Sequence, residues 1–482
     1  MSKSGRIQWM LFILLIPIAL GCKSKEENTP IKTPEVVNKT KSDVELWLTN
    51  KDKTALFKKQ NLILSFSKSS NSNPTIEIDT TQSYQSIDGF GFSLTGGSAT
   101  LLNALGATYQ DTTLKELFGT NGNGIGISYL RISIGASDLS DAPFTYDDVP
   151  AGQTDANLQN FSINREKTDL IPILKKIIAI NPSIKIMGSP WSAPIWMKTN
   201  TSFIGGSLKP EYYNAYAQYF VKYIKAMKAE GITIDAITVQ NEPLHDGNNP
   251  SMYMAADQQA IFIKNYLGPA FQSENISTKI ICYDHNADRP DYPLSILNDA
   301  DARKFVDGSA FHLYGGDISA LSQVHNAYPN KNIYFTEQWV RAPGSFTSDL
   351  QWHVENLIIG ATKNWSRNVL EWNLAADLNN GPHTVGGCTE CLPAVTIAGS
   401  SLSRNVAYYI IAHASKFVRP GSVRIASSSA SGLPNIAFKT PEGKKVLIVL
   451  NNATETKAFN IKHNDKIVTC FLNSGSVGTF VW

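Results

Sequence analysis

Short apolar segments and longer amphipathic segments alternate through most of this 482-residue chain. Apolar residues recur at helical spacing in Leu170–Ile180, Tyr212–Glu230, Ala255–Phe271 and Asp349–Thr362. Between such segments lie eight strand candidates, each nearly continuous in apolar residues: Gly89–Leu94, Tyr129–Gly135, Ile184–Ser189, Ala236–Gln240, Lys279–Tyr283, Ser309–Tyr314, Ile333–Thr336 and Val369–Trp372. Apolar strands separated by helices are typical of a parallel sheet covered by helices. Because eight such units close a sheet on itself, we predict an α/β fold with a (β/α)8 TIM barrel.

After Phe417 the pattern changes to short strands separated by turn residues. Such spacing is typical of an antiparallel β unit, and the candidates are 423–426, 435–439, 445–450, 456–461, 466–472 and 478–482. Short apolar runs between Glu45 and Phe66 indicate strands near the other end of the chain as well. An isolated strand pair is marginally stable. We therefore expect the N-terminal strands to complete the C-terminal sheet, forming an additional antiparallel β-sandwich domain.

The N-terminus has the features of an export signal. Lys3 and Arg6 precede an unbroken apolar run, residues 9–20, which is shorter than the roughly 20 residues of a membrane-spanning helix. The run ends in Ala-Leu-Gly-Cys at residues 19–22, which resembles a bacterial lipobox, although Ala19 stands where Leu is usual. We expect a lipid on Cys22 and an exported protein anchored to a bacterial membrane, at the outer membrane, cell surface or periplasm. An ordinary secretory leader that happens to contain Cys22 is the alternative.

Residues 23–42 consist mainly of Lys, Ser, Glu, Asn, Thr and Pro with almost no aromatic residue. Such a segment cannot bury enough apolar surface to fold, so we interpret it as a tether between the lipid and the first domain. The predicted organisation is a signal segment at 1–21, a tether at 22–43, N-terminal sandwich strands at 44–84, the barrel at 85–415 and the C-terminal sandwich domain at 416–482.

The composition belongs to a globular chain, with 42% hydrophobic and 17% charged residues. The net charge of +2 becomes zero once Lys3 and Arg6 are removed with the signal segment, which argues against nucleic acid as a partner. Membrane contact is expected through the lipid anchor alone. Cys388 and Cys391 form a Cys-x-x-Cys motif, and a disulfide is the simplest account of it in an oxidising compartment. Since no second ligand pair accompanies it, we predict no metal site.

Two glutamates follow predicted strands directly. Asn241-Glu242-Pro243 follows the fourth strand, and Glu337 follows the seventh. A barrel delivers both side chains to the rim at the C-terminal ends of its strands. Hydrolysis of a glycosidic bond with retention needs two carboxyl groups about 5–5.5 Å apart, one acting as acid/base and one as nucleophile. We predict Glu242 as the protonated acid/base and Glu337 as the ionised nucleophile. Carboxylates that only cap helices or pair with Arg are the alternative.

Other strand ends supply groups suited to a sugar. Asn241 places an amide beside the acid, where it can bind a sugar 2-hydroxyl, a contact that strengthens in the transition state. Two tryptophans could line a pocket or simply pack at the barrel top. The further rim candidates are Arg131, Trp191, His312, Tyr314 and Trp372.

Three motifs together resemble glycoside hydrolase family 30, the family of lysosomal glucosylceramidase. They are Ser-Pro-Trp-Ser-Ala-Pro-Ile-Trp at 189–196 followed by Met-Lys-Thr-Asn, Asn-Glu-Pro at 241–243, and Phe-Thr-Glu at 335–337. The resemblance runs from about Gln85 to the C-terminus. It implies that Asp138 binds distal glucose hydroxyls, in a pocket also lined by Trp191 and Trp372. It further implies that Arg131 and Tyr314 hold the nucleophile and that His312 lies near the acid.

The leading functional hypothesis is a retaining hydrolase of β-glucosidic bonds, above all in β-1,6-glucan, the substrate of a glucan endo-1,6-β-glucosidase. Gly-Pro-His-Thr at 381–384, followed by the Cys-x-x-Cys, is similar to the bacterial branch that includes β-1,6-glucanases. A glucosylceramidase, or a hydrolase of another small β-glucoside, is the first alternative. A surface glycan-binding lipoprotein without catalysis is the second. No cofactor is implied, because the mechanism needs only two carboxyl groups and water; the sequence gives no indication of oligomeric state.

Overall fold

The computed structural model describes residues 41–482. The predicted signal segment, Cys22 and all but the last residues of the tether lie outside the described residues. Within residues 41–482, none of the helices combines the length and the hydrophobicity that a membrane span requires.

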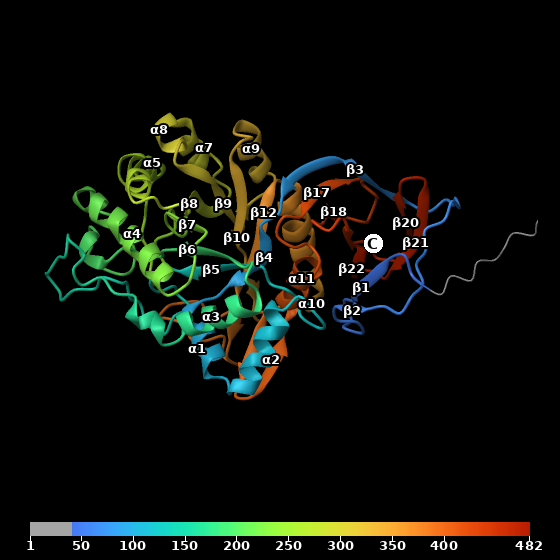
Figure 1. The fold of residues 1–482 in the computed structure, drawn as a ribbon, viewed down its shortest axis with the longest axis horizontal. Coiled ribbons are helices and arrows are strands. Elements are labelled where there is room, and N and C mark those ends of the chain that lie inside the picture. The colour runs from blue at the N-terminus through green and yellow to red at the C-terminus, as the bar shows by residue number, and fades with distance from the viewer. Residues whose placement is uncertain (1–40) are drawn as a thin grey trace, which may run out of the picture. The chain divides into compact units, whose positions relative to one another are not determined.

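The eight predicted barrel strands all form, and they close into a fully parallel barrel in the order β10-β12-β4-β5-β6-β7-β8-β9 (Figure 1). The predicted TIM barrel is therefore confirmed. The strands are β4 (Gly89–Ser93), β5 (Tyr129–Ser133), β6 (Lys185–Ser189), β7 (Ala236–Thr238), β8 (Lys279–Ala287), β9 (Val306–Gly316), β10 (Asn332–Glu337) and β12 (Ser366–Asn373).

Helices cover the outside of the barrel, and each segment with predicted helical spacing is helical. The segment predicted as one helix from 255 to 271 is instead two helices joined by a π-helical turn, Ile263–Leu267, just before Pro269. Proline lacks the amide proton that an α-helix needs at this position, so the ladder is interrupted there. The α-helices are α1 (Gly96–Ala104), α2 (Ala107–Phe118), α3 (Leu170–Ile180), α4 (Tyr213–Ala229), α5 (Ala256–Phe262), α6 (Gly268–Ser273), α7 (Asp291–Asn298), α8 (Ala300–Arg303), α9 (Ala320–Ala327), α10 (Phe346–His353) and α11 (Val406–Ser415).

Short elements complete the connections around the barrel. A second π-helical segment, η5 (Val354–Ala361), continues directly from α10. The 3-10 turns are η1 (Asn164–Lys167), η2 (Ile195–Met197) and η3 (Pro210–Tyr212). The short strands are β11 (Val340–Arg341), β13 (Ala375–Ala376), β14 (Cys391–Leu392), β15 (Val395–Ala398) and β16 (Ser401–Arg404).

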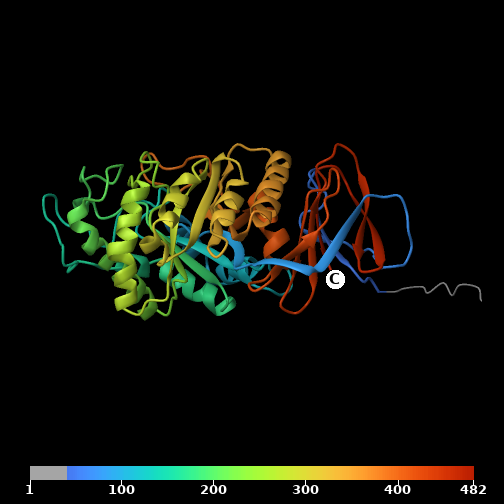
Figure 2. The same ribbon diagram turned by 90° about the horizontal axis from the view of Figure 1, so that it is seen from above.

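Strands from both ends of the chain share one nine-stranded sheet, in the order β2-β1-β22-β19-β18-β17-β3-β20-β21. The predicted pairing of N-terminal with C-terminal strands is thus confirmed, since β1 pairs with β22 and β3 with β17 and β20. Figure 2 shows β3, in blue, extending from this sheet to the barrel. The strands are β1 (Glu45–Thr49), β2 (Lys58–Lys59), β3 (Thr75–Ser86), β17 (Val423–Ser427), β18 (Asn435–Lys439), β19 (Lys445–Leu450), β20 (Lys457–His463), β21 (Lys466–Leu472) and β22 (Val477–Val481).

Two details of the N-terminal region differ from the prediction. The apolar run ending at Phe66 is not a strand, and Leu64 makes only an isolated bridge to Val44. The 12-residue strand β3 carries mostly polar residues after Ile78, so its sequence does not show the apolar alternation of a buried strand. Its partners on both sides hold it in the sheet instead.

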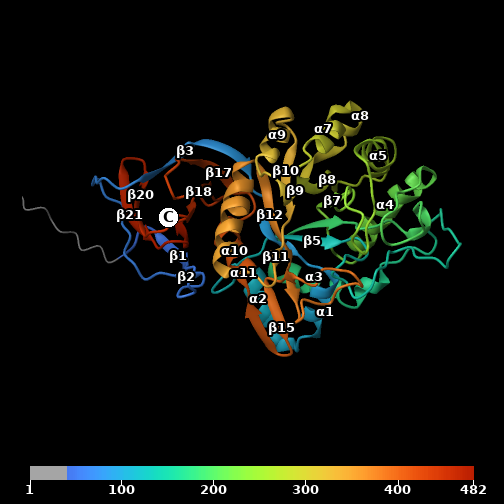
Figure 3. The same cartoon turned by 180° about the vertical axis from the view of Figure 1, so that it is seen from behind.

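The side chains of β19 point alternately to the two faces of the sheet, and they pack both in the sandwich core and against the barrel helices. Leu447 and Val449 face the sandwich core, whereas Val446, Ile448 and Leu450 belong to the same apolar cluster as the barrel helices. Successive side chains of a strand point to opposite faces, so one strand serves both cores. The segment η5 contacts β18 and β19, and helix α11 contacts β22. Figure 3 shows α10 and α11 between this sheet and the barrel strands, seen from behind.

The inside of the barrel is arranged in layers of side chains. One apolar layer comes from all but one of the barrel strands and contains Tyr129, Met187, Ala236, Ile281, Ala310, Tyr334 and Leu370. Because side chains alternate along a strand, the next inward-facing position lies two residues after each member of this apolar layer. On six of these strands that position is polar or aromatic: Arg131, Ser189, Thr238, His312, Thr336 and Trp372. The barrel therefore presents a polar layer at the C-terminal ends of its strands.

Candidate active site

The two predicted glutamates meet above this polar layer. Glu337 is the last residue of β10, and Glu242 lies just beyond β7. A carboxylate oxygen of each and a ring nitrogen of His312 all lie within 4.8 Å of one another. Both glutamates are buried, with 8% of Glu242 and 6% of Glu337 exposed. The two carboxylates therefore lie close together at the C-terminal ends of their strands.

The backbone of Glu242 has an unusual conformation for a residue with a side chain. Its φ is 45°, in the left-handed region that L-residues other than Asn, Asp and Gly rarely adopt. The Glu242 amide donates to the carbonyl oxygen of Asp284 at 3.0 Å, which ties the turn to β8. Such conformations persist where neighbouring contacts enforce them, as they do at many functional sites.

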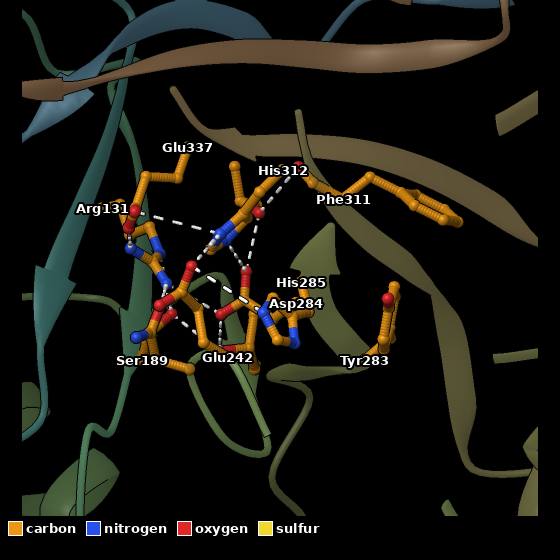
Figure 4. Close-up of polar contacts among 12 residues, drawn as sticks. Arg131, Ser189, Glu242, Tyr283, Asp284, His285, Phe311, His312 and Glu337 are labelled. Atoms are coloured by element: carbon orange, nitrogen blue, oxygen red, sulfur yellow. Dashed lines mark hydrogen bonds and ion pairs between the residues drawn. The ribbon is translucent and has the colours of Figure 1, made fainter. Parts of the chain in front are cut away.

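Arg131 is completely buried and connects the polar side chains of four strands or strand ends (Figure 4). Its Nη1 donates to Glu337 Oε2 at 2.7 Å, and Nη2 donates to Asn241 Oδ1 at 2.7 Å and to Asp284 Oδ2 at 2.8 Å. Its Nε donates to Ser189 Oγ at 3.1 Å. Arg131 thereby fixes the position of the Glu337 carboxylate.

Asp284 is a fully buried residue of this site that the sequence did not indicate as functional. Arg131, Thr238 and Thr336 donate to its carboxylate at 2.6 to 2.8 Å. His312 Nε2 lies 3.1 Å from its Oδ1. Although burial opposes ionisation, these donors and the charge of Arg131 hold the pKa of Asp284 far below its usual range. Asp284 is therefore a permanent anion.

His312 joins Asp284 to Glu242. Because Asp284 only accepts, His312 Nε2 carries a hydrogen, and the other ring nitrogen, Nδ1, lies 3.3 Å from Glu242 Oε1. Burial lowers the pKa of His312, but the surrounding carboxylates outweigh burial and raise it to about 9. The second histidine near Glu242, His285, has a pKa lowered to about 4 by burial and stays neutral. The cation beside Glu242 is therefore His312.

The two glutamates have different hydrogen-bond environments. Arg131 Nη1 and Tyr314 Oη donate to the two oxygens of Glu337 at 2.7 and 3.0 Å. Glu242 has longer contacts, with His312 and with Asn248 Nδ2 at 3.3 Å. Burial raises the pKa of Glu337, whereas the hydrogen bond and charge of His312 overcome burial and lower the pKa of Glu242. These directions are the reverse of the predicted protonation states, because the proton rests on His312 and not on Glu242.

A cavity of about 350 Å³ opens beside both glutamates. Trp191 and Trp372 form part of its wall with ring centroids 5.4 Å apart, and Arg131 lies 4.7 Å from the Trp191 ring. Asp138 is buried in the same wall, and burial followed by the charge of Glu337 raises its pKa to about 7. The other lining residues are His245, Asn248, His285, Asn286, Tyr314, Trp339, Cys388 and Cys391. A larger hollow of about 780 Å³ lies at the opposite ends of β8, β9 and β10, away from the glutamates.

Charges already in the site argue against a bound metal between the glutamates. Within residues 41–482, one group of His, Cys, Asp or Glu side chains lies close enough together to share a metal ion. It consists of Glu242, His312 and Glu337. However, Arg131 is bonded to Glu337 and His312 is cationic, so a divalent cation would be repelled by both.

Comparison with known proteins assigns the chain to a family. The model of the glycosyl hydrolase family 30 TIM-barrel domain matches residues 87–418, and that of the family 30 beta sandwich domain matches residues 421–480. The chain belongs to glycoside hydrolase family 30. The resemblance read from the three motifs is thereby confirmed, and the chain is a glycoside hydrolase.

Named family 30 relatives cover most of the chain. An endo-1,6-beta-D-glucanase of Aspergillus fumigatus is 36% identical over 418 residues, 81% of this chain and 82% of its own length. The lysosomal acid glucosylceramidase of Mus musculus is 30% identical over 430 residues, covering 83% and 81%. Among solved structures, the endo-beta1,6-glucanase BT3312 matches with a TM-score of 0.84 and 36% identity, covering 92% of this chain and 99% of that one.

The structure brings together every site residue predicted within residues 41–482. Arg131, Asn241 and Tyr314 contact the glutamates or their partners, and His312 contacts Glu242. Asp138, Trp191, Trp372 and the cysteine pair line the cavity. Cys388 and Cys391 are joined by a disulfide.

Asp284 could not be found from the sequence because of a bulge in β8. With regular alternation from Ile281, which faces inward, Asp284 would point outward. The register shifts between Tyr283 and His285, and both Tyr283 and Asp284 have positive φ, near 70°. This irregularity turns Tyr283 into the outer core and Asp284 into the barrel. No feature of the apolar pattern marks the bulge.

We predict that Asp284→Asn lowers kcat/KM about 100-fold or more, corresponding to about 3 kcal/mol, because Arg131 and His312 lose the anion that holds them. Since Asp284 is one of the groups that raise the pKa of His312, the alkaline limb of the pH–rate profile should also move to lower pH. Initial rates on an aryl β-glucoside across pH 4–10 measure both effects.

Thr336→Val is the matched control, because it removes one donor to Asp284 while keeping the side-chain shape. It should reduce kcat/KM less than about tenfold. If Asp284→Asn keeps kcat/KM within about twofold of the parent, the central role given to this carboxylate is wrong.

Proposed function

We propose that the chain is a retaining endo-1,6-β-glucanase in which Glu337 is the nucleophile and Glu242 the acid/base. The observation that carries the retaining mechanism is the separation of the two carboxylates, whose nearest oxygens lie within 4.8 Å. Retaining glycosidases keep the pair about 5–5.5 Å apart, whereas inverting enzymes need about 6.5–9.5 Å to admit a water. The spacing leaves room for the anomeric carbon and excludes a water between acid and base.

The environment of Glu337 suits a nucleophile. Arg131 Nη1 can only donate, so it requires Glu337 Oε2 to be an unprotonated acceptor. Tyr314 donates to the other oxygen. These bonds favour the ionised carboxylate, opposing the burial that raises its pKa, and they fix one orientation for attack on the anomeric carbon. The product of attack is a glycosyl ester on Glu337, which water then hydrolyses.

Glu242 has a proton source at its side. The raised pKa of His312 keeps its ring protonated, and its Nδ1 lies 3.3 Å from Glu242 Oε1. The lowered pKa of Glu242 therefore reflects a proton resting on the imidazole. When the leaving oxygen approaches, the proton passes through Glu242 to it, and His312 becomes neutral. In the second step Glu242 takes a proton from water, as microscopic reversibility requires.

The cavity supports glucose as the sugar that is attacked. Asp138 and the tryptophan pair offer a carboxyl group and flat apolar faces in one wall, a combination that sugar rings bind. A unit inside a β-1,6-linked chain is joined through C1 and the exocyclic C6, so its hydroxyls at C2, C3 and C4 are free. Such a unit can place its free hydroxyls against Asp138 while both chain directions leave through the mouth.

Glucosylceramide requires the same carboxylates and is the second candidate. The Aspergillus fumigatus endo-1,6-beta-D-glucanase and BT3312 are each 36% identical to this chain, against 30% for the Mus musculus glucosylceramidase. A catalytically silent glycan-binding protein has less support, because both glutamates and their donors are in place. The glucanase is therefore preferred.

We predict that purified protein releases short gluco-oligosaccharides from pustulan, a β-1,6-glucan, with a kcat/KM at least about 100-fold higher than on glucosylceramide or xylan. Product analysis by chromatography over the first few per cent of hydrolysis separates internal from terminal attack. Glu337→Gln is the control for contaminating activity. Cleavage of xylan or glucosylceramide with pustulan left intact would refute the substrate assignment.

We also propose that the enzyme is exported and carries a lipid on Cys22, in a bacterial membrane that meets extracellular polysaccharide. The support is the signal-like run ending in Ala-Leu-Gly-Cys at 19–22 and the polar segment after it. Expressed in a bacterium that processes lipoproteins, the full chain should fractionate with membranes, and Cys22→Ser should lose that association. Release of parent and variant alike into the soluble fraction would contradict the anchor.

A further inference from the structure

A disulfide forms part of the cavity wall, and no step of the proposed reaction uses it. Cys388 and Cys391 are bonded to each other, and both line the cavity. They lie in a small apolar cluster with Trp191 and Trp372 that is separate from the main core. The disulfide therefore contributes to the site rather than to the stability of the barrel interior.

The loop that carries the disulfide, residues 382–392, holds Asp138 at two points. The Cys388 amide donates to Asp138 Oδ2 at 3.3 Å, and the Thr384 amide donates to the Asp138 carbonyl oxygen at 2.8 Å. Gly387 is packed so closely that a Cβ there would lie 2.4 Å from the same carbonyl oxygen. Both the backbone and the carboxyl group of Asp138 thus depend on the disulfide loop.

The disulfide loop also contacts the segments that follow both catalytic glutamates. Thr384 Oγ1 donates to the carbonyl oxygen of Asn249, and Asn249 Nδ2 donates to that of Val385 at 3.0 Å. Asn249 belongs to the segment after Glu242. On the other side, β14 pairs with β11, which follows Glu337 in the chain. The loop therefore spans the rim between Asp138 and the two carboxylates.

We propose that the Cys388–Cys391 disulfide is a positioning element of the glucose site, which holds Asp138 in its binding orientation. The bond closes a short ring and removes alternative conformations of the loop, so the Cys388 amide keeps its place beside the carboxyl group. The two cysteines act through Asp138 and touch no reacting atom. This inference rests on the proposed function, because it takes Asp138 as a glucose ligand.

The test is the double variant Cys388→Ser, Cys391→Ser in the full chain. KM for a β-1,6-linked gluco-oligosaccharide should rise about tenfold, while kcat changes by less than about threefold, because the two glutamates keep their donors. Glu390→Gln is the matched control, because Glu390 lies in the same loop and the change weakens only its exposed ion pair with Arg341 of β11. Its KM should equal that of the parent. An unchanged KM in the double variant overturns the proposal.

A chemical arm avoids dependence on folding of the variant. Dithiothreitol supplies two electrons and two protons to the folded parent protein, which yields two thiols and the cyclic disulfide of the reagent. KM should rise as in the double variant, return on reoxidation, and not respond in the double variant itself. If thiol labelling shows complete reduction and KM does not change, the proposal fails.

Asp138→Asn distinguishes this inference from the function on which it rests. If the disulfide acts through Asp138, adding Asp138→Asn to the double variant should raise KM less than it does in the parent. Independent, multiplicative effects would refute the inference. If Asp138→Asn raises KM but removal of the disulfide does not, the inference fails and the proposed function stands. If Asp138→Asn leaves KM unchanged, the glucose-binding role itself is wrong.

Discussion

The buried guanidinium of Arg131 is the group around which the site is organised. Moving a cation out of water costs several kcal/mol, which is offset only if anions and acceptors surround it at good geometry. Asp284, Glu337, Asn241 and Ser189 meet that need and come from different strands or strand ends. Because buried Arg131 needs an acceptor for each of its N–H groups, its hydrogen bond to Glu337 also fixes the orientation of the Glu337 carboxylate.

Charge balance in this buried cluster connects structure to proton movement. Asp284, Glu242 and Glu337 face two cations, Arg131 and His312, so full ionisation of these five buried groups leaves one net negative charge among them. A sugar that fills the cavity will remove remaining water and strengthen every one of these interactions. The proton that sits between His312 and Glu242 is consequently the mobile one, while Asp284 stays ionised throughout.

Much of the fold and site could be predicted because simple rules apply locally. Each barrel strand is nearly continuous in apolar residues, and the groups that follow it reach one rim, so the chain's pattern alone is enough to bring Glu242 and Glu337 together. Family motifs added Asp138, which no pattern would have singled out. The strand β3 was missed because its residues after Ile78 are mostly polar. The break before Pro269 was missed because the apolar spacing continues through it. Asp284 was missed because one bulge in β8 reverses inside and outside.

The central claim is that Glu337 forms a covalent bond to the sugar. Incubation with 2-deoxy-2-fluoro-β-glucosyl fluoride slows hydrolysis of the glycosyl-enzyme ester, so that the ester accumulates and can be located by mass spectrometry of peptides. The account predicts a single fluoroglucosyl group on the peptide that contains Glu337, and none in Glu337→Gln. Labelling of the Glu242 peptide instead, or full turnover by Glu337→Gln, would contradict it.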